Sequence, residues 1–317
     1  MKARQRTTPS AGRSGLVIGS FGRHVLIEEP DGAQRICHPK GKKNEAVVGD
    51  QVTWEASEDE GRIVAVQTRR NLLFRQDEMR TKSFAANLDQ VCVFLGATPE
   101  FSERQLTRAL IACEAAHIPA LIVLNKHDLR AEFDAAWARL KPYRNAGYPM
   151  LALSLTPGYE HGVDELQARL HDKATLILGP SGAGKSSLIN RLLPNARVLT
   201  QQISQALNSG KHTTTSTTWY WMNEAKVGAI IDSPGFQEFG LQHVEAAQLA
   251  ALMPDIAAQT GGCKYYNCTH RVEPGCSVRA ALTDEDRPDS SEAPRIHASR
   301  YRMFLELFEE LSQPPRY

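Results

Sequence analysis

The fold of this 317-residue chain is decided by the stretch Gly179-Pro180-Ser181-Gly182-Ala183-Gly184-Lys185-Ser186. An apolar run at 176–178 precedes it, and Ser187 opens a segment with helical spacing that follows it. This order of strand, loop and helix is typical of the phosphate-binding loop, in which backbone N–H groups wrap a polyphosphate. We expect Lys185 to stabilise the phosphates of a nucleoside triphosphate and Ser186 to hold Mg²⁺. The alternative is a glycine-rich surface turn.

Charge and hydrophobic pattern argue against a globally basic protein, a membrane-spanning protein and a secreted protein. The formal net charge is only +1, so any contact with nucleic acid must come from charge gathered into patches. No apolar run approaches the roughly eighteen residues that span a bilayer, so we expect no membrane segment. Residues 1–14 are basic and polar, without the apolar core of a secretory signal, and we expect a disordered tail. The alternative, a mitochondrial transit peptide, would need an apolar face that this segment lacks. Three of the six cysteines lie between 263 and 276 beside a histidine, which suggests metal ligation in a reducing compartment, so we expect a cytoplasmic protein.

Residues 15–80 have the pattern of a small β-barrel. Short apolar runs at 15–18, 23–27, 47–54 and 62–66 are separated by turn residues. The spacing favours an RNA-binding barrel of the OB type, the oligonucleotide-binding fold. Its phosphate contacts could come from a set of basic side chains, Arg35, Lys40, Lys42, Lys43, Arg69 and Arg70. The alternative is a β domain whose charged loops are merely solvated.

Residues 81–242 alternate between apolar strands and helices. Helical spacing covers 103–117 and 131–143, and strand-like runs lie at 91–95, 120–124, 150–153, 175–178 and 227–231. This order predicts an α/β domain with a mostly parallel sheet covered on both faces. Ligands bind such sheets at the carboxyl ends of the strands.

A base-reading motif follows the second of these strands, as Asn125-Lys126-His127-Asp128. A carboxylate in this place can accept hydrogen bonds from the ring N–H and the amino group of guanine, so we expect Asp128 to choose GTP over ATP. Lys126 would lie over the base, Asn125 would brace the loops, and Ser154 would steady the base loop. Without the phosphate-binding loop, the motif would be only a polar turn.

Two further segments predict Mg²⁺ and γ-phosphate contacts. Asp232 ends a strand and is suited to the shell around Mg²⁺, while Gly235 can donate its N–H to the γ-phosphate. A threonine of 213–215, for which we take Thr214, could complete the Mg²⁺ coordination in a loop that is ordered by the γ-phosphate. The alternative for the segment at 232–235 is a simple Ser-Pro-Gly turn. The alternative for the threonine-rich loop is a segment that merely leads into a strand.

The order of the motifs is unusual, because the base-reading motif precedes the phosphate-binding loop. In most GTPases the phosphate-binding loop comes first. The sequence therefore predicts a circularly permuted GTPase domain, an arrangement that can preserve the sheet when the old termini lie close together.

Residues 243–317 contain a metal-binding pattern. Three cysteines and one histidine lie within fourteen residues, as Cys263, Cys268, His270 and Cys276. Such a set can close tetrahedrally on one structural Zn²⁺; the alternative is buried free cysteines. Basic and aromatic residues surround it, as in RNA-binding knuckles, namely Lys264, Tyr265, Tyr266, Arg271 and Arg279. An amphipathic segment at 296–311 completes a zinc-binding domain with helices.

Together these motifs closely resemble the circularly permuted GTPases of the RsgA (YjeQ) type. The resemblance implies an OB barrel, a GTPase domain and a zinc domain that all touch ribosomal RNA. It also implies a monomer that binds GTP or GDP with Mg²⁺, acts late in maturation of the small ribosomal subunit, is stimulated by that subunit, and couples hydrolysis to release. Phe236 stands where many GTPases have a water-positioning glutamine, and the resemblance points to His212 as the catalytic group instead.

Two rival functions are open at this point. A GTP-binding RNA scaffold without significant turnover would use GTP only as a structural ligand, but intact Lys185, Ser186 and Asp232 count against it. An ATP-using phosphotransferase would keep the phosphate-binding loop, but Asp128 argues against it.

Overall fold

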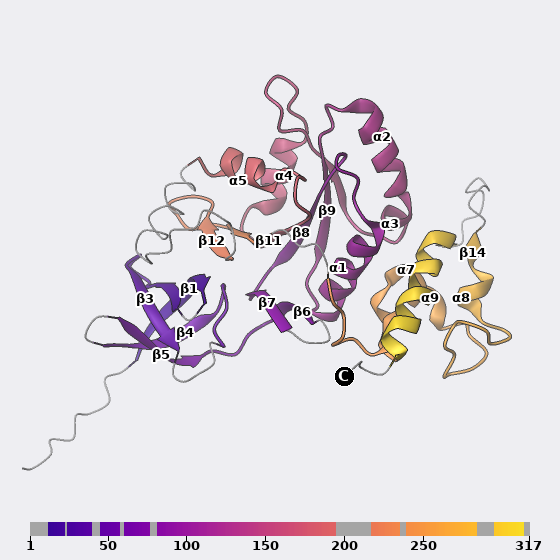
Figure 1. Ribbon diagram of the computed structural model, residues 1–317, viewed down its shortest axis with the longest axis horizontal. Helices are drawn as coiled ribbons and strands as arrows, with labels where there is room; N and C mark the ends of the chain where they lie inside the picture. The colour runs from indigo at the N-terminus through magenta and orange to yellow at the C-terminus, as the bar shows by residue number, and fades with distance from the viewer. Residues whose placement is uncertain are drawn as a thin grey trace, which may run out of the picture.

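The computed structural model describes residues 12–22, 24–39, 45–57, 60–76, 81–194, 217–234, 239–283 and 295–313. Figure 1 shows a small barrel at the N-terminal end, a central sheet covered by helices, and a helical unit at the C-terminal end. Within these ranges, no helix combines the length and the apolar character that crossing a membrane requires.

Five strands form the N-terminal barrel. Four of them lie in the order β2-β3-β5-β4, and β1 closes the barrel because it pairs antiparallel with both β2 and β4. Side chains such as Val17, Ile27 and Trp54 fill its interior. The structure confirms the predicted small OB-type barrel. Its strands are β1 (Arg13–Phe21), β2 (His24–Glu28), β3 (Gln34–Pro39), β4 (Gln51–Ala56) and β5 (Gly61–Val66).

Two details of the barrel differ from the prediction. The run at 47–54 is not one strand: β4 begins only at Gln51, because Asp50 accepts the Val47 N–H at 2.8 Å and Gly49 turns the chain with φ of 92°. Strand β3 was not predicted, because half of its side chains are polar and only Cys37 is buried, so it lacks the apolar alternation of a half-buried strand.

The central sheet has the strand order β10-β9-β8-β11-β13-β12, and β12 alone runs antiparallel to its neighbour in this part. Alternate side chains of β8 enter two cores: Val91 and Val93 join the core that contains residues of α1, and Cys92 and Phe94 join the core that contains residues of α4 and α5. The predicted doubly covered parallel sheet is confirmed. Its elements are β8 (Gln90–Gly96), α1 (Glu103–Ala115), β9 (Ala120–Asn125), α2 (Arg130–Arg139), α3 (Lys141–Asn145), β10 (Met150–Ala152), α4 (Val163–Leu170), β11 (Ala174–Leu178), α5 (Lys185–Leu192), β12 (Thr218–Trp221) and β13 (Ala229–Asp232).

The helix predicted over 131–143 is two helices. The first, α2, ends at Arg139, and α3 begins at Lys141 with Pro142 in its first turn. Proline has no N–H to donate and its ring clashes with the carbonyl four residues earlier, so it fits the start of a helix but not its interior.

The barrel and the central sheet are continuous. Strand β12 pairs with β13 on one side and with β1 of the barrel on the other, where Gly19 lies opposite Thr218. A separate hairpin, β6 (Leu72–Gln76) and β7 (Thr81–Ala86), follows the barrel. The predicted domain boundary between residues 80 and 81 falls between the two strands of this hairpin.

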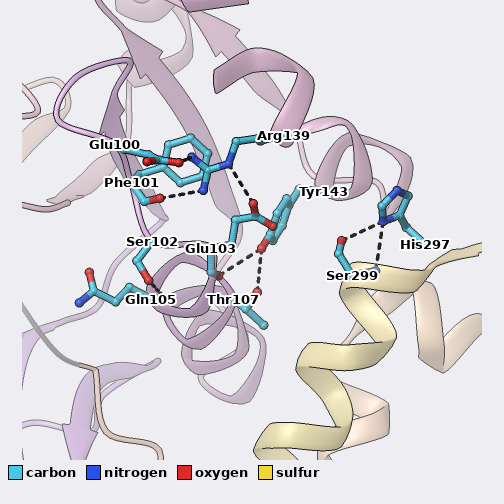
Figure 2. A network of polar contacts seen from close by, with 10 residues as sticks. All are labelled: Glu100, Phe101, Ser102, Glu103, Gln105, Thr107, Arg139, Tyr143, His297 and Ser299. Atoms are coloured by element: carbon cyan, nitrogen blue, oxygen red, sulfur yellow. Dashed lines mark hydrogen bonds and ion pairs between the residues drawn. The ribbon is translucent and has the colours of Figure 1, made fainter. Parts of the chain in front are cut away.

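The C-terminal unit packs against the first helix of the central domain. Glu310 of α9 pairs with Arg104 at 2.7 Å and also with Arg108, both on α1. Figure 2 shows Tyr143 of α3 contacting the Thr107 hydroxyl of α1, beside the start of α9. The elements of this unit are the 3₁₀ helix η1 (Ala246–Leu252), α7 (Pro254–Thr260), α8 (Ser277–Ala280), β14 (Leu282–Thr283), β15 (Ile296–His297) and α9 (Ala298–Ser312).

Candidate functional site

The segments that carry the predicted nucleotide ligands leave one edge of the central sheet. Strands β9, β10, β11 and β13 run parallel within the order given above, so their carboxyl ends meet at the same edge. Asn125 ends β9, Ser154 follows β10, Gly179 follows β11 and Asp232 ends β13. The fold therefore gathers motifs that lie far apart in the sequence.

The glycines of the phosphate-binding loop are required by the space around them. A Cβ on Gly179 would lie 2.0 Å from the Phe94 carbonyl oxygen, and one on Gly184 would lie 2.5 Å from Asn125 Nδ2. Gly184 also has φ of 104°, a conformation that L side chains rarely adopt. The loop runs into α5, whose first-turn residues Ser186 and Ser187 are exposed, so the amino end of this helix can receive a phosphate.

Lys185 and Asp232 form the charged centre of this edge. Lys185 Nζ donates to the carbonyl oxygens of Gly179 at 2.7 Å and Pro180 at 2.8 Å. Burial lowers the pKa of Lys185, while the charge of Asp232 acts in the opposite direction. Burial also raises the pKa of Asp232 to about 6, against the effect of Lys185. A partly buried cation and a partly buried carboxylate at the phosphate-binding loop are the groups that a triphosphate and its Mg²⁺ require.

The base-reading motif is linked to the phosphate-binding loop. Asn125 Nδ2 donates to the Ala183 carbonyl oxygen at 3.0 Å, so it joins the two loops. Lys126 has φ of 73°, and its Nζ donates to the carbonyl oxygen of Thr98, in the loop after β8. The sequence did not single out Thr98, because the only signal was a polar residue shortly after a strand.

Both carboxylate oxygens of Asp128 are held by hydroxyl groups. Ser154 Oγ donates to Oδ1 at 2.9 Å and Thr156 Oγ1 donates to Oδ2 at 3.0 Å. Partial burial raises the pKa of Asp128, but these bonds outweigh it and the pKa lies below its usual value. Thr156 was missed by sequence reasoning, although its place two residues after Ser154 in the same loop was a usable signal. A pocket of about 330 Å³ opens here, lined by His127, Asp128, Arg130, Tyr159, Glu160 and His161.

Several predicted ligands lie outside the described residues. They are the catalytic His212, the Mg²⁺ ligand Thr214 and the γ-phosphate contact Gly235, together with Phe236, Lys40, Lys42 and Lys43.

The predicted zinc ligands converge. The candidate ligand atoms of Cys263, Cys268, His270 and Cys276 all lie within 4.8 Å of one another. Tetrahedral zinc with its usual bond lengths places two sulfurs roughly 3.8 Å apart and a sulfur and a nitrogen roughly 3.6 Å apart. Here Cys263 Sγ lies 3.9 Å from Cys276 Sγ, and His270 Nδ1 lies 3.4 and 3.6 Å from those two sulfurs. The four residues therefore fit one zinc ion.

The loop between these ligands, 263–276, is fixed on one side and open on the other; we call it the zinc knuckle. Glu273 accepts the backbone N–H groups of Thr269, Arg271 and Val272, and Tyr301 of α9 donates its hydroxyl to the His270 carbonyl at 2.7 Å. Three of its apolar side chains are exposed, namely Tyr265, Tyr266 and Val272.

The other three cysteines lie apart from the zinc knuckle. Cys37, Cys92 and Cys113 are buried. Burial raises the pKa of Cys37 and of Cys92 to about 12, which keeps both thiols protonated.

Comparison with known proteins matches this architecture. A family model described as RsgA GTPase matches residues 66–242. A protein of Variovorax paradoxus named small ribosomal subunit biogenesis GTPase RsgA is 59% identical over 299 residues, which are 94% of this chain and 92% of that protein. A protein of the same name from Paraburkholderia xenovorans is 45% identical over 311 residues, 96% of each chain.

Two solved structures share the whole arrangement. YloQ, described as a circularly permuted GTPase, has a TM-score of 0.66 at 25% identity and covers 100% of both chains. YjeQ from Thermotoga maritima has a TM-score of 0.69 at 27% identity and covers 95% of this chain and 99% of that one. The permuted order of the loops is thus common to this chain and a solved relative, and the chain belongs to the RsgA GTPase family.

Proposed function

We propose that this protein hydrolyses GTP late in the maturation of the small ribosomal subunit and couples hydrolysis to its release from that subunit. The observation that carries the proposal is the junction of the base-reading motif with the phosphate-binding loop through Asn125 and Ala183. A relative that is 59% identical bears the name of a small ribosomal subunit biogenesis GTPase.

The nucleotide would be held from both ends. Asp128 accepts hydrogen bonds from guanine, Lys126 covers the base, and His127 and Ser154 support the base loop. Ser186, Asp232 and Thr214 bind Mg²⁺, which neutralises charge on the β- and γ-phosphates together with Lys185. The phosphates are wrapped by Gly179, Pro180, Ser181, Gly182, Ala183, Gly184, Ser187 and Gly235.

A single zinc ion would hold the C-terminal unit, through Cys263, Cys268, His270 and Cys276. A site with four protein ligands leaves no open position, so the zinc is structural. We propose that its exposed neighbours, Tyr265 and Tyr266 beside Lys264, contact ribosomal RNA, since aromatic faces stack on unpaired bases and cations pair with phosphates. The barrel would supply further RNA contacts, and the protein would act as a cytoplasmic monomer.

The test is GTP hydrolysis by the purified protein with small ribosomal subunits, with large subunits and alone. We expect a large stimulation by small subunits only. Absence of stimulation would contradict the proposal and favour a GTP-binding RNA scaffold without significant turnover.

His212 is the proposed catalytic group that orients the attacking water when the subunit is bound. His212→Ala should leave GTP affinity within about twofold of wild type and remove the stimulated turnover. Stimulated turnover equal to wild type would show that another group orients the water.

A further inference from the structure

Two stacked imidazole rings join the base-reading motif to the loop that follows β10. The ring centroids of His127 and His161 are 4.0 Å apart, and the ring planes differ by 16°. The same His127 ring forms a T-shaped pair with Phe133 of α2, with centroids 4.7 Å apart and an interplanar angle of 85°. His161 therefore packs on a ring that α2 already holds in place.

The loop at 154–161 is closed at its two ends. The Ser154 N–H donates to the His161 carbonyl at 3.0 Å, and the His161 N–H donates to the Ser154 carbonyl at 3.1 Å. The Thr156 N–H also donates to Ser154 Oγ, at 3.3 Å. Because the ends are bonded to each other, a displacement of His161 displaces the two residues whose hydroxyls contact Asp128.

Those hydroxyls fix the plane of the Asp128 carboxylate. Ser154 donates one hydrogen bond to Oδ1 of the carboxylate, and Thr156 donates one to Oδ2. An ionised carboxylate offers about four lone-pair sites, so each oxygen keeps an acceptor position for an N–H of the base. Recognition of guanine then depends on how firmly the loop holds this plane.

We propose that His161, through its stack on His127, is a positioning residue for guanine recognition and sets the selectivity of the site for the 2-amino group. The inference rests on the proposed binding of GTP. In this role His161 acts through Ser154 and Thr156, whose hydroxyls contact Asp128.

The charges around His127 give the stack a pH dependence. His161 and Arg130 face the His127 ring with positive or potentially positive charge, and Arg130 Nη1 lies 3.0 Å from His127 Nε2. Asp134, Asp128 and the pocket residue Glu160 are the acidic groups nearby. Burial, followed by His161 and Arg130, lowers the pKa of His127. A lowered pKa means that the stacked arrangement prefers the neutral ring, so the stack weakens as pH falls.

The experiment measures the dissociation constants of GDP and of inosine diphosphate, which lacks the 2-amino group. His161→Ala should raise the GDP dissociation constant about tenfold and reduce the preference for GDP over inosine diphosphate, with kcat at saturating GTP unchanged. His161→Phe keeps an aromatic face and should bind GDP within about twofold of wild type at about pH 8. The matched control is His171→Ala, an exposed histidine beyond the end of α4, which should match wild type.

The pH profile separates the stack from a general structural role. Between about pH 8 and about pH 5.5, wild-type GDP affinity should fall severalfold. The affinity of His161→Phe should fall less, because this variant removes the charge of residue 161 while burial and Arg130 still act on His127. If His161→Ala does not fold, this comparison decides the matter alone. Unchanged affinity in His161→Ala, or equal loss in His161→Phe, would overturn the inference; a wild-type protein that binds no GDP would instead contradict the proposed function.

Discussion

The nucleotide edge of the central sheet and the zinc knuckle are built in opposite ways. The knuckle takes all its ligands from within fourteen residues, whereas the nucleotide edge takes its groups from positions between 125 and 232. A short loop can close around an ion as soon as the ion binds. The nucleotide edge exists only when the parallel strands have paired. Loss of one ligand should therefore unfold the knuckle locally but leave the sheet at the nucleotide edge intact.

Removal of the zinc is the strongest test of this difference. Cys276→Ser, or treatment with a chelator, should release the metal and unfold the knuckle, because structural zinc contributes on the order of 10 kcal/mol to small zinc domains. GDP affinity should change less than about twofold. Zinc content, hydrogen exchange over 254–283 and GDP binding measure the three effects.

The matched control is Cys113→Ser, which changes a buried cysteine outside the knuckle and should keep its zinc. A knuckle that stays protected from exchange after the metal has left would show that its own packing suffices.

The ion pair between Asp255 and Arg300 joins α7 to α9, and it is the next largest test. Arg300 is 2% exposed, and its guanidinium donates to Asp255 at 2.9 and 3.0 Å and lies over the Tyr143 ring. Asp255→Ala leaves a buried charge unpaired and should lower the free energy of unfolding by about 3–5 kcal/mol. Urea denaturation measures the change.

The control is a more exposed ion pair, the one that Arg104 of α1 forms with Glu310 of α9. Arg104→Ala removes a partner of Glu310 that is 55% exposed and should cost less than about 1 kcal/mol. Equal losses in the two variants would argue that burial does not matter at this contact.

Lys185→Ala tests the nucleotide edge without touching the knuckle. Loss of the cation at the phosphates should reduce GTP turnover by about a hundredfold to a thousandfold, with zinc content unchanged. The control is Lys173, an exposed lysine just before the first residue of β11, whereas Lys185 lies beyond the last residue of that strand. Lys173→Ala should keep wild-type turnover; a comparable loss there would indicate a general effect of removing positive charge.

Asp128→Asn is expected to give the smallest of these effects and the most specific one. An amide can present a donor where guanine also presents donors, so GTP affinity should fall about tenfold to a hundredfold. Xanthosine triphosphate carries an acceptor oxygen where guanine has its 2-amino group, so it should bind the variant more tightly than it binds the wild-type protein. Competition binding measures both, with the exposed Asp164→Asn on α4 as the control. Unaltered base preference would remove Asp128 from the base-reading role.

Local signals in the sequence were sufficient for much of the fold. The apolar runs at 91–95, 120–124 and 175–178 fall within β8, β9 and β11, because a strand buried on both faces needs apolar residues throughout. Two boundaries were missed. The helix break before Pro142 arises because the proline ring does not fit a helix interior, and the late start of β4 depends on a turn that Asp50 closes by accepting a hydrogen bond.

The sequence by itself determined which chemistry to look for: the phosphate-binding loop, the base-reading motif, their permuted order and the four candidate zinc ligands are all readable as residue types at fixed spacing. Only the tertiary structure decided which groups meet. The stack of His161 on His127 and the hydroxyl of Thr156 on Asp128 join residues on different loops. Their spacing in the sequence has no characteristic period, because the contact depends on how β9 and β10 pair.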